Sequence, residues 1–427
     1  MSVTLFQPKT KNMKKIILLI TTCFTLASQA QTFPVGHMSI NFKDATRTGG
    51  YSISGTTVVT MPGTGRNIGT EVYYPAAVAG NNSAVANGQF PIVVFGHGFA
   101  MTWDSYDNIY NRLASLGYIV LLPRTESSIF PTPSHGDFAA DMKLLASQGL
   151  LLNTTNTPTA LATFNSKVLQ KSAIGGHSMG AGCSFVAAQN NTTVTCVFNL
   201  AAATSNTAGI SSIAGASLVT VPLLMISGEK DSVADSTVQN SHYTPTSSAI
   251  KFHSIIKDVT HCDFGNGTSS TCTIGQAACS GTGCNATLFA RYMSYVEPFL
   301  AHQLKNDCAA GNTFMTLILN PSVDRVGRKV LGNIACAVTG SQEQSFSNSL
   351  TVFPNPTEGN LTITYTTKND LLVNFELYDI SGRLVLNEQS SSHKTIHEIN
   401  LEGLERGSYL LVVHYENSKK AYKIIKN

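Results

Sequence analysis

The pattern of hydrophobic residues along residues 37–310 predicts buried strands that alternate with helices. Short continuous apolar runs are typical of strands buried on both faces of a sheet. Such runs lie at residues 90–95, 118–122, 172–175, 194–200, 221–226 and 254–256. Segments compatible with helices lie between and after them, at residues 105–116, 136–151 and 289–304. This alternation predicts an α/β fold, in which a mainly parallel sheet is covered by helices on both faces.

Hydrophobic and polar positions follow other patterns outside these runs. Residues 37–78 alternate between apolar and polar, which predicts antiparallel strands at an edge of the sheet. Beyond a polar linker at residues 341–349, residues 350–427 contain only short alternating strands separated by turn signals. We therefore expect an α/β domain over residues 31–340 and a small all-β sandwich at the C-terminal end. The pattern assigns no role to residues 310–340.

The first 30 residues are organised like an export signal. Two lysines precede an apolar stretch at residues 16–26, and Ser28-Gln29-Ala30 is a small-x-small cleavage site. Cleavage there would leave Gln31 as the first residue, and Met13 is an alternative start. A buried N-terminal helix is the competing interpretation. The stretch is too short to span a bilayer, and no other segment is long enough, so we expect no transmembrane segment in the mature protein.

Composition narrows the class of protein. Charged residues make up only 12% of the 427 residues, and the formal net charge is +3. No basic stripe or acidic tail is present, which argues against a nucleic-acid partner. Few charges with many Ser, Thr, Asn and Gly residues favour a secreted bacterial surface protein.

Cysteine usage favours disulfides. The chain has nine cysteines, of which Cys23 would leave with the signal. The remaining even number is typical of an exported disulfide protein: Cys183, Cys196, Cys262, Cys272, Cys279, Cys284, Cys308 and Cys336. Residues 262–284 hold four of them in a Gly/Thr/Ser-rich loop, and a Cys183–Cys196 bridge would tie a helix to the next strand. The pairing stays open. A zinc cluster is the alternative, although paired C-x-x-C units are absent.

The segment Gly176-His177-Ser178-Met179-Gly180 forms a G-x-S-x-G motif between an expected strand and an expected helix. This context is typical of a nucleophile elbow, which exposes a serine on a strained turn. Glycines at both ends of the motif would let strand and helix approach without a Cβ clash. A serine hydroxyl attacks well only when it is fixed next to a base. A chance match in a Gly- and Ser-rich chain is the alternative interpretation.

A base and an orienting acid are expected after the serine, in the chain order Ser, Asp or Glu, His. Asp231 follows the apolar run at residues 221–226, and His261 follows the run at residues 254–256. Ligand sites gather at the carboxyl ends of strands in such sheets. We therefore predict that Ser178, Asp231 and His261 form a catalytic triad.

Other acidic and basic residues near these strands have alternative roles. Glu229 and Asp235 are alternative acids. His253 is the alternative base, but we expect it before its strand and at the wrong edge of the sheet. Asp258 and Asp263 are expected to serve loop structure.

Backbone N–H groups are expected to stabilise the oxyanion of the reaction. Met179, directly after the serine, would supply one N–H group, and Phe99 in the loop at residues 96–101 would supply the other. Their side chains would form an apolar wall around the acyl group. Core packing is the alternative role for Phe99. His97 and His177 are interpreted as hydrogen-bonding supports rather than as bases.

Several motifs resemble the dienelactone-hydrolase-like branch of α/β-hydrolases, which includes chlorophyllase-like, platelet-activating-factor-acetylhydrolase-like and cutinase-like polyester-hydrolysing enzymes. They are Tyr73-Tyr74-Pro75-Ala76, the run from Phe90 to Gly98, and Gly176 to Gly180. The resemblance covers roughly residues 37–310. It implies an α/β-hydrolase fold and a carboxylic ester hydrolase that uses the triad and oxyanion donors predicted above.

One segment departs from the polyester-hydrolysing members. Those enzymes commonly carry a tryptophan after the strand that follows the elbow helix, where this chain has Leu200-Ala201-Ala202-Ala203-Thr204. A flat aromatic platform is therefore missing there. Trp103, the single tryptophan, either lines the cleft or packs against the next helix.

The C-terminal segment resembles type IX secretion sorting domains. The motifs are Val352 to Thr357, Leu377 to Arg383, Gly407-Ser408-Tyr409 and the closing Lys423-Ile424-Ile425-Lys426. The resemblance implies export to the periplasm, passage through the type IX secretion machinery, and release or attachment at the cell surface, often with removal of this domain. A carbohydrate-binding or adhesion sandwich is the alternative.

Together these features predict a secreted serine esterase that acts on a small or polymeric ester and uses no cofactor or metal, because every reacting group belongs to the protein. A cutinase-like polyester hydrolase is the alternative within the same class. A non-catalytic surface-binding protein on a hydrolase scaffold is the alternative from another class.

Overall fold

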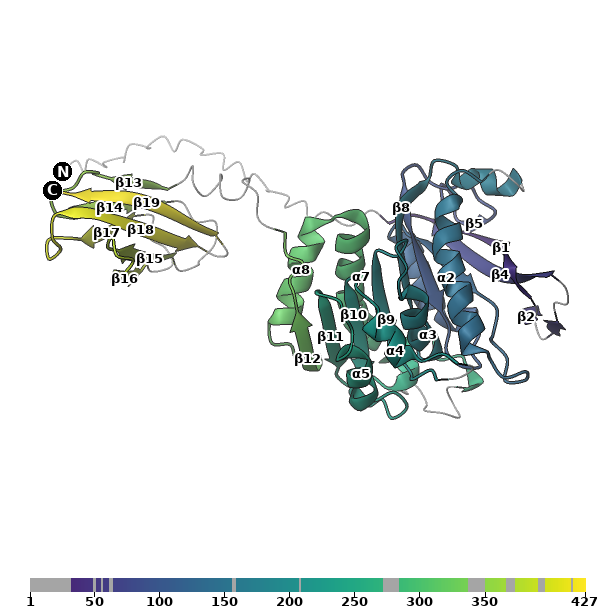
Figure 1. Cartoon of the computed structure of the whole chain (residues 1–427). Coiled ribbons are helices and arrows are strands. Elements are labelled where there is room, and N and C mark those ends of the chain that lie inside the picture. Colours follow the sequence, from purple (N-terminus) through teal and green to yellow (C-terminus); the bar gives the residue numbers. More distant parts are fainter. Residues whose placement is uncertain are drawn as a thin grey trace, which may run out of the picture. The chain divides into compact units, whose positions relative to one another are not determined.

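The computed structural model describes residues 32–48, 51–54, 57–60, 64–155, 159–206, 209–271, 284–336, 350–365, 373–390, 396–415 and 418–427. The expected signal peptide, the linker and residues 272–283 of the cysteine-rich loop lie outside the described residues. The chain forms two compact units, Met1–Ile334 and Ala335–Asn427, and each is described by itself (Figure 1).

A ten-stranded sheet, counted over the described part of the chain, forms the centre of the first unit. Its order is β12 (Arg325–Leu331), β11 (Lys251–Ile256), β10 (Leu223–Gly228), β9 (Cys196–Leu200), β8 (Val168–His177), β6 (Phe90–Gly96), β7 (Ile119–Pro123), β4 (Thr64–Pro75), β1 (Val35–Thr48) and β5 (Gly80–Asn81). The strands from β11 to β7 are parallel. Antiparallel β12 lies beyond one end, and β4 and β1 lie beyond the other. Strands β2 (Tyr51–Ser54) and β3 (Thr57–Thr60) form a separate hairpin.

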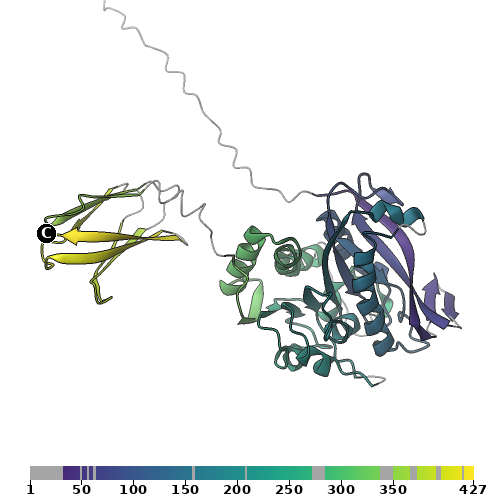
Figure 2. The same ribbon diagram turned by 45° about the horizontal axis from the view of Figure 1, so that its top comes forward.

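Helices cover both faces of this sheet and enclose two hydrophobic cores (Figure 2). One core includes side chains from α2 (His135–Leu151), α3 (Met179–Ala188), α4 (Ser212–Ser217) and α5 (Ser236–Tyr243). The other includes side chains from α1 (Asp107–Ser115), α7 (Cys284–Lys305) and α8 (Cys308–Leu319). Short 3-10 turns are η1 (Trp103–Tyr106), η2 (Thr159–Phe164) and η3 (His261–Phe264). This layered arrangement confirms the predicted α/β-hydrolase fold.

The stretch at residues 310–340 received no role from the sequence, and its described part, residues 310–336, adds a helix end and a strand to the first unit. Helix α8 leads into β12, which pairs with the outer edge of β11. Arg325 and Arg328 donate to the carbonyl oxygens of Leu317 and Ile318, each at 2.7 Å. Positive charges at the C-terminal end of a helix are favourable because they face the negative end of its dipole. A Cys308–Cys336 disulfide closes this region.

The second unit consists of antiparallel strands in two sheets. One sheet has the order β13 (Thr351–Phe353), β14 (Asn360–Thr364), β17 (Ile396–Asn400). The other has the order β16 (Leu384–Gln389), β15 (Val373–Tyr378), β18 (Gly407–Tyr415), β19 (Ser418–Lys426). Alternate residues of both sheets share a single hydrophobic core. The prediction of a small all-β domain is thus confirmed.

The bridge considered between Cys183 and Cys196 does not form. Cys183 and Cys196 are free and fully buried. Cys183 belongs to the core that contains α3, whereas Cys196 belongs to the core on the opposite face of the sheet. The sheet therefore separates the two thiols. Burial raises the pKa of the Cys183 thiol to about 12, which makes it an inert thiol.

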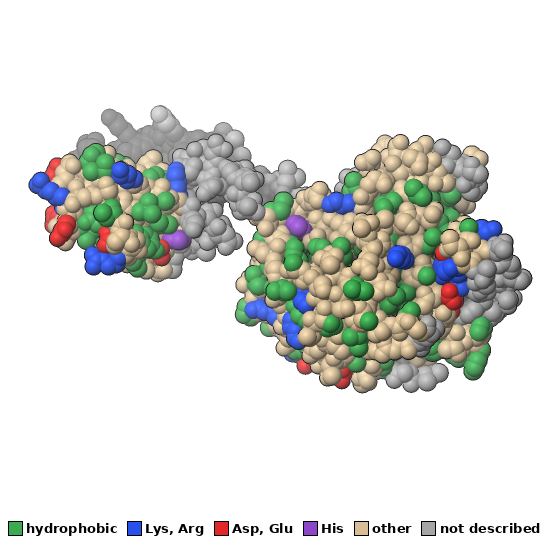
Figure 3. All heavy atoms as spheres, viewed as in Figure 1, with side chains coloured by type: hydrophobic (Ala, Val, Ile, Leu, Met, Phe, Trp, Pro, Cys, Tyr) green, Lys and Arg blue, Asp and Glu red, His purple; other side chains and the backbone are tan. Residues whose placement is uncertain are grey.

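The surface reflects the low content of charged residues. Figure 3 shows one face of the first unit, Met1–Ile334, which we call the hydrolase unit after its fold. On this face, scattered Lys, Arg, Asp and Glu side chains lie among mostly neutral ones. Among the described residues, no helix has both the length and the apolar character needed to cross a membrane.

Candidate active site

Ser178 lies on a sharp turn between β8 and α3. Its backbone has φ 53° and ψ −116°, in the positive-φ region that non-glycine residues rarely adopt. The turn leaves no room for side chains on its flanks. A Cβ atom on Gly180 would lie 2.1 Å from the carbonyl oxygen of Gly96, and one on Gly176 would lie 2.6 Å from the same oxygen. The elbow glycines therefore let the turn contact the end of β6 as well as join β8 to α3.

The structure brings Ser178, His261 and Asp231 together in one line of hydrogen bonds. Nε2 of His261 lies 2.9 Å from Oγ of Ser178, and Nδ1 lies 2.9 Å from Oδ2 of Asp231. The three residues are 8%, 6% and 5% exposed, so the line is largely shielded from water. A carboxylate only accepts hydrogen bonds, so Nδ1 carries the hydrogen and Nε2 is free to take the serine proton.

The Asp231 carboxylate is held from two sides. Its Oδ1 atom accepts backbone N–H groups from Val233 at 2.9 Å and from Ala234 at 2.8 Å, while Oδ2 faces His261. Burial alone would raise the pKa of Asp231, but the hydrogen bond from His261, the charge of that imidazole and the two N–H groups together lower it. The carboxylate is therefore ionised at neutral pH.

The alternative acids and base have other partners. Glu229 accepts the backbone N–H of Asp258, and Asp235 caps the first turn of α5. Asp263 forms a capping box with Thr260 at the start of η3. The carboxylate of Asp258 forms an ion pair with Lys230, and that of Asp263 accepts the backbone N–H of Thr260. Both contacts are structural, as expected for these two residues.

The expectation for His253 needs correction. His253 lies within β11 rather than before it, opposite Met225 of β10. Its Nε2 atom lies 2.8 Å from Oγ of the buried Ser227, and burial lowers its pKa to about 4. The apolar run at residues 254–256 predicts a strand that begins at residue 254, but β11 begins three residues earlier, at Lys251. Lys251 and His253 break the apolar pattern, although both belong to the strand.

Phe99 and Met179 differ in exposure. Phe99 follows β6 and is 41% exposed, whereas Met179 opens α3 and is only 1% exposed. Met179 packs into the core that contains α3, so Phe99 alone of this pair presents a broad apolar surface to solvent. The carbonyl of Gly98 accepts the N–H of Met101 at 3.1 Å, which closes the loop around Phe99.

Two buried histidines support the site, as the sequence indicated. His97 has Nδ1 2.9 Å from the carbonyl oxygen of Gly98 and Nε2 2.8 Å from that of Thr125. His177 has Nε2 2.9 Å from the carbonyl oxygen of His261. Burial lowers the pKa of His97, and burial together with the charge of His261 lowers that of His177 to about 3. The imidazole of His177 is therefore neutral near pH 7.

Trp103 packs in an aromatic group on the face covered by α1. Its ring lies 5.9 Å from that of Tyr73 and 5.8 Å from that of Tyr110, between ring centroids. Of the two predicted roles, packing against the next helix is the one that the structure favours.

The segment after His261 is bonded to the loop after β6. The backbone N–H of Asn266 donates to the carbonyl of Ser105 at 2.8 Å, and the hydroxyl of Thr271 donates to the carbonyl of Ala100 at 2.8 Å. Cys262, next to the histidine, is disulfide-bonded. These contacts could not be predicted from the sequence, because they join loops more than 150 residues apart.

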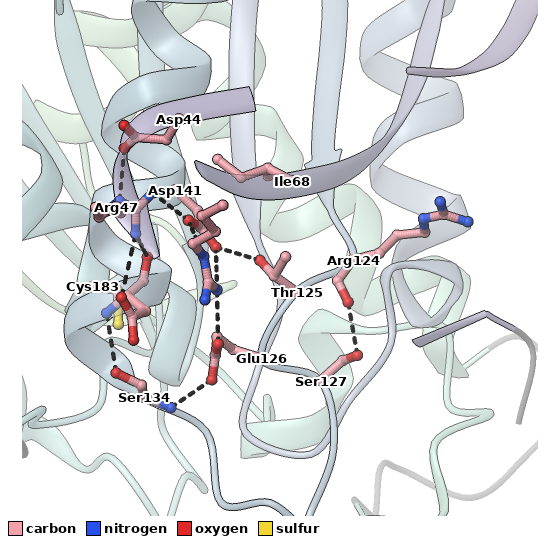
Figure 4. Close-up of polar contacts among 12 residues, drawn as sticks. Asp44, Arg47, Ile68, Arg124, Thr125, Glu126, Ser127, Ser134, Asp141 and Cys183 are labelled. Carbon is pink, nitrogen blue, oxygen red and sulfur yellow. Dashed lines mark hydrogen bonds and ion pairs between the residues drawn. The ribbon is translucent and has the colours of Figure 1, made fainter. Parts of the chain in front are cut away.

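A buried ion cluster fixes the loop after β7, and this loop contacts His97. Asp141 of α2 accepts hydrogen bonds from Arg66 at 2.7 and 2.8 Å and from Thr125 at 2.6 Å. Arg66 also pairs with Glu126 at 2.7 Å. Figure 4 shows Arg47 of β1 and Thr125 of this loop at the Asp141 carboxylate. The cluster therefore secures the loop whose Thr125 carbonyl faces His97.

Residues 28–280 match the family described as PET hydrolase-like. The chain belongs to the PET hydrolase-like family. Chlorophyllase type 0 from Chenopodium album is 28% identical to this PET hydrolase-like protein over 182 residues. The match covers 41% of this chain and 50% of that relative, so the chain spans about half the length of the curated relative that it matches. Both similarities agree with a hydrolase.

The C-terminal unit of this PET hydrolase-like protein also has a family. Residues 351–427 match the secretion system C-terminal sorting domain. This domain identifies a protein of the type IX secretion route, which is released outside the cell or attached to its surface. A carbohydrate-binding sandwich, the alternative for this unit, is therefore not favoured.

Proposed function

We propose that this chain is a secreted serine hydrolase that cleaves carboxylic esters through an acyl-enzyme on Ser178. The observation that carries the proposal is the line of two 2.9 Å contacts from Asp231 through His261 to Ser178, at the turn between β8 and α3. A hydroxyl beside a base, with the base oriented by a carboxylate, is the arrangement that activates a serine.

Acylation follows from this arrangement. Oγ of Ser178 attacks the ester carbonyl carbon while Nε2 of His261 takes the hydroxyl proton, and the carbonyl π electrons move to oxygen. Collapse of the tetrahedral intermediate breaks the bond to the alcohol oxygen, which receives the proton from His261. Asp231 remains ionised and stabilises the imidazolium that forms. Water, activated by His261, then releases the acid and restores Ser178.

We assign stabilisation of the oxyanion to the backbone N–H groups of Phe99 and Met179. Met179 is the first residue of α3, so its N–H group lies at the positive end of a helix dipole. Phe99 lies on the closed loop after β6. Two such donors stabilise the oxyanion more strongly than water does, because they are already oriented.

A polyester is a second candidate substrate, favoured by the match of residues 28–280 to the PET hydrolase-like family. Aromatic polymers need a surface on which rings can lie. After β9 the chain has Ala201-Ala202-Ala203-Thr204, which contains no aromatic side chain. The exposed Phe99 supplies a single ring. We therefore expect small soluble esters to be hydrolysed faster than a polyester.

Hydrolysis of p-nitrophenyl esters from acetate to palmitate tests the proposal on the full-length chain. Ser178→Ala is the test variant, and Ser184→Ala within the helix that follows, α3, is the matched control. We expect activity to be lost only in Ser178→Ala, with a chain-length optimum that measures the acyl site. Release of soluble products from a polyester film tests the second candidate. Unchanged ester hydrolysis in folded Ser178→Ala protein would contradict the mechanism.

The sorting domain suggests the partner for export. We propose that residues 351–427 are the part that the type IX machinery binds. A chain that ends at residue 340 is then expected to reach the periplasm and stay there. Its appearance in the medium would argue against this role.

A further inference from the structure

We infer that Tyr106 is a positioning residue, which couples the oxyanion loop to the backbone of His261 through the side chain of His177. The inference rests on the proposed function, because it concerns the groups that would perform the reaction. Tyr106 and His177 are both fully buried between the loop after β6 and the segment that carries His261.

Three hydrogen bonds form the connection. The N–H of Gly98 lies 2.8 Å from Oη of Tyr106, and that oxygen lies 2.9 Å from Nδ1 of His177. At the other side of the ring, Nε2 of His177 lies 2.9 Å from the carbonyl oxygen of His261. A Cβ atom on Gly98 would lie 3.1 Å from Oη of Tyr106 and 3.3 Å from Nδ1 of His177, so glycine permits this close approach.

The direction of each bond follows from the chemistry of the groups. A carbonyl only accepts, so Nε2 of His177 must carry a hydrogen. The ring is neutral because burial lowers its pKa to about 3, and Nδ1 is then an acceptor. Tyr106 therefore donates its O–H to Nδ1 and accepts the N–H of Gly98. The thioether of Met101 also lies 3.1 Å from Oη, but sulfur is the weaker acceptor.

This arrangement fixes the two peptide groups that flank Gly98. The N–H of Gly98 is held by Tyr106, and the carbonyl of Gly98 is held by Met101 N–H at 3.1 Å. The C=O and N–H of a planar trans peptide point in opposite directions, so the Gly98 carbonyl sets the direction of the Phe99 N–H. The same connection holds the His261 backbone, from which the imidazole reaches Ser178.

Tyr110 offers a matched control for Tyr106. Tyr110 lies one helical turn further along the chain and is also buried. Its hydroxyl forms a hydrogen bond with the side chain of Tyr73. Tyr106→Phe and Tyr110→Phe each remove one buried hydroxyl from the same region. A packing role for Tyr106 predicts equal effects, whereas a positioning role predicts a catalytic effect for Tyr106 alone.

The test compares kcat and KM of both variants on p-nitrophenyl butyrate. We expect Tyr106→Phe to lower kcat about tenfold with KM changed less than about twofold, because alignment is lost while binding is kept. Tyr110→Phe is expected to keep the wild-type kcat. A rescue pair adds to this: His177→Gln, which can still donate and accept, should retain more kcat than His177→Phe.

Equal kcat in the two tyrosine variants would overturn the inference while leaving the triad intact. Wild-type protein without Ser178-dependent hydrolysis would overturn the proposed function and the inference together. If Tyr106→Phe does not fold, nitrogen NMR of the wild-type imidazoles decides. We expect His177 to stay in the neutral Nε2–H form down to pH 4. An Nδ1–H form would contradict the proposed hydrogen bonds from Tyr106 and to His261.

Discussion

The carboxylate of Asp231 lies 2.9 Å from Nδ1 of His261, while its second oxygen accepts two backbone N–H groups. The carboxylate is therefore oriented by the loop after β10 before any substrate binds. This arrangement selects the tautomer in which Nε2 of His261 faces Ser178.

Asp231→Asn is expected to lower kcat about 10³- to 10⁴-fold with little change in KM, because an amide can hold the wrong imidazole tautomer. Asp235→Asn is the matched control, since asparagine also caps a helix well. Steady-state kinetics on a soluble ester measures both. Retention of more than a tenth of the wild-type kcat by Asp231→Asn would contradict the assigned role.

Gly180→Ala is expected to destabilise the hydrolase unit by more than about 3 kcal/mol. Its Cβ atom would lie 2.1 Å from the carbonyl oxygen of Gly96, and backbone cannot move aside cheaply. Gly136→Ala on α2 is the control, because its Cβ would meet only ordinary contacts at 3.5 Å. Urea unfolding followed by the fluorescence of Trp103, the single tryptophan, reports this unit. Equal midpoints for both variants would argue against the tight elbow.

Asp141→Asn is expected to cost about 3–5 kcal/mol of the free energy of unfolding. It removes the buried carboxylate that accepts from Arg66 and Thr125, and so leaves a buried guanidinium poorly compensated. Asp137→Asn, whose contact with Arg47 is 3.4 Å and whose side chain is 42% exposed, should change it by less than about 0.5 kcal/mol. The same fluorescence-detected unfolding separates the two cases. A small effect of Asp141→Asn would show that the cluster contributes little to stability.

Acid is expected to destabilise the hydrolase unit between pH 6.5 and 4. Burial lowers the pKa of His177 to about 3 and that of His253 to about 4, from an ordinary value of 6.5. In this window the unfolded chain binds protons that the folded chain does not, so the free energy of unfolding falls as pH falls. Each histidine contributes a slope of up to about 1.4 kcal/mol per pH unit.

His253→Gln tests this slope without touching the proposed catalytic groups. The glutamine amide keeps a polar partner for Ser227 but does not titrate. We expect the dependence of unfolding free energy on pH to become shallower by about one proton in this window. An unchanged slope would mean that His253 does not resist protonation in the folded protein.

Much of the fold could be predicted because its central strands are simple. β6, β7 and β10 are buried along their whole length, so each reads as a continuous apolar run. β12 was missed because it covers the sheet edge and its residues are mostly half-buried or exposed. The Cys183–Cys196 bridge could not be decided from the sequence, because the sequence does not tell which face of a sheet a thiol occupies.

The proximity of the three predicted triad residues was predictable where chemistry and chain order coincide. Ser178, Asp231 and His261 each follow a strand of the parallel sheet, and the parallel direction alone places such positions at one edge. Tyr106 and the Arg66–Asp141 cluster could not be predicted, because their contacts span 71 and 75 residues and depend on side-chain directions. A buried tyrosine in a helical segment gives no local signal that distinguishes it from core.

Covalent labelling with a fluorophosphonate, read by peptide mass spectrometry, tests the central claim most directly. The account predicts a single phosphonyl group on Ser178 of the full-length chain, formed about 10³-fold more slowly in His261→Gln. No adduct on Ser178, or equally fast labelling in His261→Gln, would contradict the claim that His261 activates this serine.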